Sequence, residues 1–241
     1  MTARADLTHE LAGTALRITL DRPDHRNAFS GDMMHALVRC LREAEERECA
    51  VVSIEAVGED FCTGRDHNES PKVSTRWTHE QWRAMTKDVF GAFGAFGGAT
   101  VAAVKGRAAG FGALLATCCD VTIAADDARL AFDEVVLGFA PRGVMSRLFN
   151  RLGERRLTEL VLTGRSVPGN EAWVLGLVTE HVAPELLAGR LDETVATLTR
   201  HDRTILRAAK SYLAELATMN PADRVRLGTS DRLHPVDGAN V

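Results

Sequence analysis

Short strand patterns alternate with helical patterns along the first three quarters of this chain. Segment 15–20 alternates apolar and polar residues, as a half-buried strand does, and segment 30–46 places its apolar residues at a helical period. The apolar run at 101–104 is typical of a strand that is buried on both faces. Strands that alternate with helices pair in parallel, so the pattern predicts an α/β fold. From residue 184 onward the pattern is helical only.

The composition of the 241 residues argues against several classes of protein. The net charge is −4 and the 29 lysines and arginines are scattered, so we expect no nucleic-acid partner. No apolar run reaches the length of a membrane span, and the first residues lack the apolar segment of a signal peptide. We therefore expect no membrane association and a cytoplasmic location. The five cysteines have no metal-binding spacing, which favours free buried thiols and no metal site.

Two glycine-containing turns each follow a predicted strand. One covers residues 61–66, and the other covers residues 106–113 and leads into a predicted buried helix at 111–119. Glycine permits a tight bend, and the first N–H groups of a helix have no partner within it. Two such turns brought together would hold two donors against one oxygen, which stabilises an enolate or a tetrahedral oxyanion. Taken alone, each turn is explained equally well by glycines that serve packing.

Five ordered motifs resemble the crotonase (enoyl-CoA hydratase/isomerase) superfamily over residues 10–190. They are LDRPDHRNAF at 20–29, GEDFCTGRD at 58–66, VAAVKGRAAGFGALLATCCD at 101–120, FDEVVLG at 132–138 and the segment 162–178. The resemblance implies a spiral of ββα units in residues 1–190. It implies a helical C-terminal region in residues 191–241, which packs on a neighbouring subunit in a homotrimer or a dimer of trimers. It also implies an acyl-CoA substrate, with an acyl carrier protein as the alternative carrier, and no separate cofactor.

The resemblance assigns the oxyanion hole to the backbone N–H groups of Arg65 and Phe111, which follows Gly110. The Arg65 side chain can be an exposed one under this assignment, because only its amide is needed. The residues that the resemblance assigns to coenzyme A are Arg22, Arg26, Thr63, Arg65, His67 and Gly110. The arginine side chains are candidates for the phosphates, and the backbone of the turn would border the adenine. For Arg22 and Arg26, a solvated surface position explains the charge equally well.

Of the two glutamates that the family's hydratases use, this sequence matches one and has a non-acidic residue at the position of the other. Glu134 aligns with the second glutamate of the family's hydratases, and it precedes an apolar run at 135–137 where burial would raise its pKa. The first hydratase glutamate would fall at Leu114, which cannot transfer a proton. A single carboxylate suits an isomerase, which removes a proton from one carbon and returns it to another. The family's Δ3,Δ2-enoyl-CoA isomerases look similar in this respect.

Three residues depart from the family pattern. Asp133 replaces the usual proline, and on an extended segment its side chain would point away from that of Glu134. Arg142 lies in the shortened loop 139–143, where it would bind a substrate carboxylate or lie on the surface. Phe111 adds bulk at the oxyanion turn, which we expect to narrow the acyl pocket.

Four functions remain open on these residues. The first is isomerase-like proton transfer by Glu134. The second, motivated by Arg142, is a decarboxylase or a C–C bond lyase or hydrolase acting on a carboxylated acyl-CoA. The third is an enoyl-CoA hydratase that uses Glu134 alone or with another acid. The fourth is a non-catalytic scaffold with the same fold.

Overall fold

Two sheets form the centre of the molecule. The computed structural model describes residues 6–70 and 72–228. The larger sheet has the order β1-β2-β3-β4-β6-β9, in which β1 pairs antiparallel with β2 and all other pairs are parallel. Its strands are β1 (Leu7–Ala12), β2 (Ala15–Leu20), β3 (Val51–Ala56), β4 (Ala99–Val104), β6 (Val121–Ala125) and β9 (Glu180–Val182). The smaller sheet contains β5 (Arg107–Ala109), β7 (Arg129–Ala131) and β8 (Ser166–Pro168).

The helices follow the predicted alternation. They are α1 (Gly31–Glu46), α2 (His79–Ala95), α3 (Phe111–Cys118), α4 (Arg142–Thr163), α5 (Gly169–Leu175), α6 (Leu187–Leu198), α7 (Arg203–Thr218) and α8 (Pro221–Gly228). Four short 3-10 turns are η1 (Pro23–His25), η2 (His67–Glu69), η3 (Asp133–Val135) and η4 (Pro184–Leu186). The parallel strands and the helical end confirm the α/β expectation.

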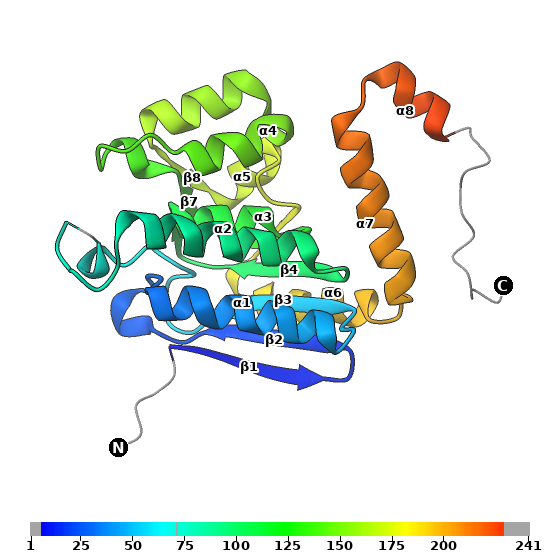
Figure 1. The fold of residues 1–241 in the computed structure, drawn as a ribbon, viewed down its shortest axis with the longest axis horizontal. Coiled ribbons are helices and arrows are strands. Elements are labelled where there is room, and N and C mark those ends of the chain that lie inside the picture. Colours follow the sequence, from blue (N-terminus) through cyan, green and yellow to red (C-terminus); the bar gives the residue numbers. More distant parts are fainter. Residues whose placement is uncertain (1–5, 71, 229–241) are drawn as a thin grey trace.

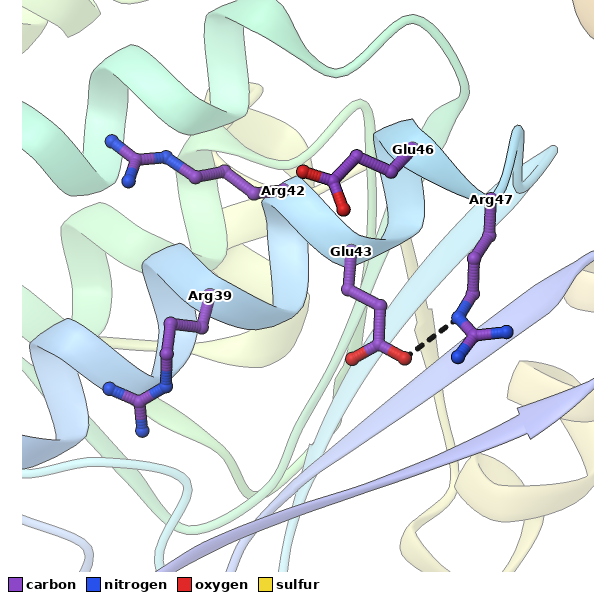
Figure 2. Close-up of a pocket in the computed structure, with 5 residues that line it drawn as sticks. All are labelled: Arg39, Arg42, Glu43, Glu46 and Arg47. Atoms are coloured by element: carbon purple, nitrogen blue, oxygen red, sulfur yellow. Dashed lines mark hydrogen bonds and ion pairs between the residues drawn. The ribbon is translucent and has the colours of Figure 1, made fainter.

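Local sequence explains where the two helices beside the sheet begin. The Ser30 side chain accepts a hydrogen bond from the Met33 N–H and caps α1. Thr78 and Gln81 form a reciprocal capping box at the start of α2. The apolar face of α1 is buried, and α1 and α2 lie side by side in front of the larger sheet (Figure 1). The opposite, charged face of α1 forms a shallow solvated surface, where Arg47 donates to Glu43 at 2.8 Å (Figure 2).

The C-terminal helices α7 and α8 stand to one side of the rest of the chain (Figure 1). No side chain of α7 is buried, and polar contacts join this helix to the body. Arg203 donates to the Cys49 carbonyl at 3.0 Å, and Lys210 donates to Asp120 at 2.9 Å. The boundary predicted after residue 190 falls within α6, whose Leu187 and Leu191 are buried in the core. The domain division and the expected homotrimer stay predictions.

Candidate active site

The two glycine turns meet backbone to backbone. Cys62 donates its N–H to the Arg107 carbonyl at 3.1 Å and accepts from the Ala109 N–H at 2.9 Å. A Cβ at Gly64 would lie 3.3 Å from the Ala109 oxygen, and a Cβ at Gly112 would lie 2.2 Å from the Cys62 oxygen. Position 112 therefore admits only glycine without movement of the main chain.

This contact leaves two backbone donors free at one place. Phe29 donates to the Gly64 carbonyl at 2.8 Å and accepts from Asp66 at 2.9 Å, so the N–H of Arg65 between them points away from Phe29. Phe111 is the first residue of α3, and its N–H has no acceptor within the helix. Neither N–H has a hydrogen-bond partner among the described residues. Both residues line the same cavity, as an oxyanion hole requires, and their role as its donors stays a prediction.

The Glu134 carboxylate lies beside the second turn. A Cβ at Gly110, where φ is +50°, would sit 3.7 Å from Glu134 Oε1. The other oxygen, Oε2, is buried and has no hydrogen-bond partner among the residues that the structure describes. Burial raises the pKa of the Glu134 carboxyl, and the positive charge of Arg65 only partly opposes this rise. A carboxyl with a raised pKa that faces a cavity is suited to exchange a proton with a ligand.

The segment around Glu134 is a turn, whereas the sequence had led us to expect an extended segment. Residues Asp133–Val135 form the 3-10 turn η3, and Asp133 and Glu134 are both among the residues that line the cavity. Asp133 accepts a hydrogen bond from Arg107 Nη2 at 2.5 Å, and this ion pair joins η3 to β5. The expected extended conformation was therefore wrong, while Asp133 forms its ion pair with Arg107 and not with Glu134.

The cavity has a volume of about 440 Å³. Of the predicted site residues, those that line it are Thr63, Arg65, His67, Gly110, Phe111, Glu134 and Arg142. Arg22 and Arg26 are not among the lining residues. Arg22 donates to Asp66 at 2.7 Å and Arg26 donates to Asp60 at 2.6 Å. The assignment of these two arginines to coenzyme A phosphates stays a prediction.

The side chains at the turn differ from the expected picture in one respect. The Phe111 ring is 7% exposed and packs against the rings of Phe29 and Phe90, at centroid distances of 5.0 and 5.9 Å. Most of its bulk therefore fills the core instead of the cavity. Leu114 lies one turn further along α3, is 4% exposed, and adds an apolar patch to the cavity wall.

One face of α2 completes the wall, and the sequence analysis did not identify its polar residues. These polar residues are His79, Arg83 and Thr86, which line the cavity together with Trp82. Their spacing of three and four residues is the helical period, which is the signal that would have found them together. The Arg65 guanidinium lies 5.7 Å from the centre of the Trp82 ring. Burial lowers the pKa of Arg65, and the negative charge of Glu134 opposes this decrease.

The cysteines take no part in this site. Cys62 lies in the first turn, but burial raises the pKa of its thiol to about 12, so it is not a nucleophile at neutral pH. All five cysteines are free, and four of them are buried. Within the described residues, no cluster of acidic, histidine or cysteine side chains is arranged to hold a metal ion, and no helix is long and apolar enough to cross a bilayer.

The model of the family described as enoyl-CoA hydratase/isomerase matches residues 10–233 of the chain. The chain belongs to the enoyl-CoA hydratase/isomerase family. A 2,3-dehydroadipyl-CoA hydratase of Escherichia coli is 31% identical over 83% of this chain and 78% of its own length. An enoyl-CoA hydratase structure from Mycobacterium smegmatis superposes with a TM-score of 0.86 at 27% identity, over 94% of this chain and 89% of that one. A structure from Thermobifida fusca in complex with CoA superposes with a TM-score of 0.82 at 29% identity, over 93% of this chain and 90% of that one.

These comparisons confirm the resemblance to the crotonase superfamily and the α/β fold with its C-terminal helices. The protein is an acyl-CoA-processing enzyme of this family. Which reaction it catalyses depends on the residues of the cavity, because members of one fold family perform different reactions.

Proposed function

We propose that the protein moves the double bond of a 3-enoyl-CoA to the 2-position by proton transfer through Glu134. The observation that supports this proposal is that the cavity wall offers, within the described residues, one carboxylate without an ion-pair partner and an apolar residue at the position of a second acid. Glu134 is the one carboxylate on the wall that has no ion-pair partner among the described residues, and Leu114 stands where a second acid would act. Coenzyme A is proposed as the carrier because a related structure holds it.

The proposed reaction needs only groups that the chain supplies. The thioester oxygen accepts hydrogen bonds from the N–H groups of Arg65 and Phe111, which makes the protons on C2 more acidic. The Glu134 carboxylate takes one proton from C2, and the negative charge of the resulting dienolate is held at that oxygen. The carboxyl then gives its proton to C4, the double bond ends between C2 and C3, and the carboxylate is regenerated. No water molecule is consumed.

The reaction is tested by incubating the purified protein with a 3-enoyl-CoA in heavy water. We expect the double bond to move to C2–C3, with deuterium incorporated through exchange at the Glu134 carboxyl. Mass spectrometry measures the deuterium, and absorbance of the conjugated thioester measures the double-bond position. An unchanged substrate that contains no deuterium would rule out isomerisation of that thioester.

Hydration is the second candidate, and the name of the Escherichia coli relative favours it. Addition of water to a 2-enoyl-CoA needs a base for water and an acid for the α-carbon. Asp133 lines the cavity and would be the second carboxyl, but it is held by Arg107. Accumulation of a 3-hydroxyacyl-CoA from a 2-enoyl-CoA would select hydration, and its absence alongside double-bond migration would select isomerisation.

The raised pKa of Glu134 predicts the pH dependence of the reaction. The group must be ionised to take a proton, so kcat/KM is expected to rise with pH through one ionisation. The midpoint should lie above the ordinary glutamate value of about 4.3, because burial favours the neutral carboxyl. A pH series of kcat/KM measures it. A midpoint at or below the ordinary value would contradict the assignment of Glu134 as the base.

A further inference from the structure

One arginine of the cavity wall has no function in the proton transfer just described. Arg142 is the first residue of α4 and lines the cavity. A Cβ at the next residue, Gly143, would lie 3.7 Å from Leu114 Cδ2. Leu114 is in turn one helical turn from the oxyanion position, since its N–H donates to the Gly110 carbonyl at 3.0 Å. The start of α4 therefore lines the cavity beside Leu114, near the start of α3.

The charges of the wall are not balanced within the protein. Two of its carboxylates are neutralised, Asp66 by Arg22 and Asp133 by Arg107. The arginines on the wall have no ion pair with any described residue, and these arginines are Arg65, Arg83 and Arg142. The cavity thus presents more positive charge than Glu134 alone can offset. An anionic ligand would meet unused guanidinium groups on two sides.

The arginines differ in their surroundings. Arg65 and Arg83 lie near Trp82, on the side of the turn and α2. Arg142 is exposed and begins α4, and the same part of the cavity lining includes Leu114, Leu137, Phe139 and Val144. A charge-assisted hydrogen bond is stronger than one between neutral groups, and the planar guanidinium matches the geometry of a carboxylate. An uncharged acyl chain would offer Arg142 nothing to bind.

We propose that the acyl group carries a second carboxylate, remote from the thioester, which binds the guanidinium of Arg142. This inference rests on the proposed action on acyl-CoA and adds the substrate class: mono-thioesters of dicarboxylic acids. The remote carboxylate takes no part in bond making. Its contact with Arg142 holds C2 and C4 of the acyl chain beside Glu134.

The inference is tested by calorimetric binding of saturated thioesters, which cannot react. The pairs are glutaryl-CoA with pentanoyl-CoA and adipyl-CoA with hexanoyl-CoA, matched in chain length and different only in the terminal carboxylate. At least one dicarboxylic thioester is expected to bind about tenfold or more tightly than its partner, as for a hydrogen bond between charged groups. The preference should disappear in Arg142→Gln and persist in Arg155→Gln, which removes an exposed charge of the same helix outside the cavity.

Each other result has a distinct meaning. Equal binding of both members of every pair would overturn the inference and leave the proposed acyl-CoA function standing. A preference that survives in Arg142→Gln would also overturn it. If Arg142 bound coenzyme A phosphates instead, the variant would weaken both members of a pair equally, and free coenzyme A as well. Failure of every thioester to bind would refute the proposed function, and the inference with it.

Discussion

Replacing Glu134 by glutamine is expected to lower kcat for double-bond migration by about 10²–10⁴-fold. The amide has the size of the carboxyl but cannot accept and return a proton. Binding of acyl-CoA should change little, because the backbone donors of Arg65 and Phe111 are untouched. Steady-state kinetics on a 3-enoyl-CoA measures the loss. Glu154→Gln is the matched control, since Glu154 is exposed on α4 and does not line the cavity.

Stability measurements separate this loss from misfolding. The pKa of Glu134 is raised in the folded chain, so ionisation of this carboxyl opposes folding as the pH rises through that pKa. The glutamine variant has no such ionisation, and its melting temperature relative to the native protein should therefore be higher at pH 7 than at pH 4. An inactive variant that melts below the native protein at pH 7 would point to misfolding. A fully active one would exclude Glu134 as the acid–base group.

Substituting Gly112 by alanine is expected to damage both stability and catalysis. The new Cβ would lie 2.2 Å from the Cys62 carbonyl oxygen and 2.7 Å from the Cys62 side chain, and the carbonyl cannot rotate away as a flexible side chain can. Relief requires α3 to move away from the first turn, which costs about 1–3 kcal/mol of unfolding free energy. The N–H of Phe111, one residue earlier, moves with it, and loss of one oxyanion donor lowers kcat by about 10²–10³-fold.

Urea denaturation and kcat, measured where both proteins are folded, test this prediction. Gly94→Ala is the control, because Gly94 is exposed in α2 and a Cβ there has nothing within 4 Å. That change should add about 0.5–1 kcal/mol to stability by favouring the helix and should leave kcat unchanged. A folded Gly112→Ala protein with native kcat would show that catalysis does not depend on the position of the Phe111 N–H.

The sequence predicted strands β2 and β4 well, because their apolar residues are buried and follow a clear pattern. Strand β1 was not predicted, since it is an edge strand in which only Leu7 is buried and the pattern shows no alternation. The two glycine turns were found because tight bends need glycine. That they meet through Cys62 and Ala109 depends on tertiary contacts, which a local pattern does not contain.

The conformation around the acid was the part that local reasoning missed. Asp133 and Glu134 lie in a 3-10 turn that an ion pair with Arg107, 26 residues earlier, joins to β5. Similarly, no local pattern showed that Arg22 pairs with Asp66, which lies 44 residues further along the chain. Charged residues separated this far in sequence give no local sign that they will pair in the fold.

The proposed oxyanion donors are main-chain groups, and this affects how an enzyme that uses them can evolve. A substitution at position 65 or 111 changes a side chain but keeps the N–H, so selection can alter these side chains while the thioester oxygen remains bound. The acid at 134, the residue at 114 and the arginine at 142 lie on separate segments and contribute through their side chains. Descendants of such a chain can therefore acquire a new reaction or a new acyl group through single substitutions, without rebuilding the group that activates the thioester.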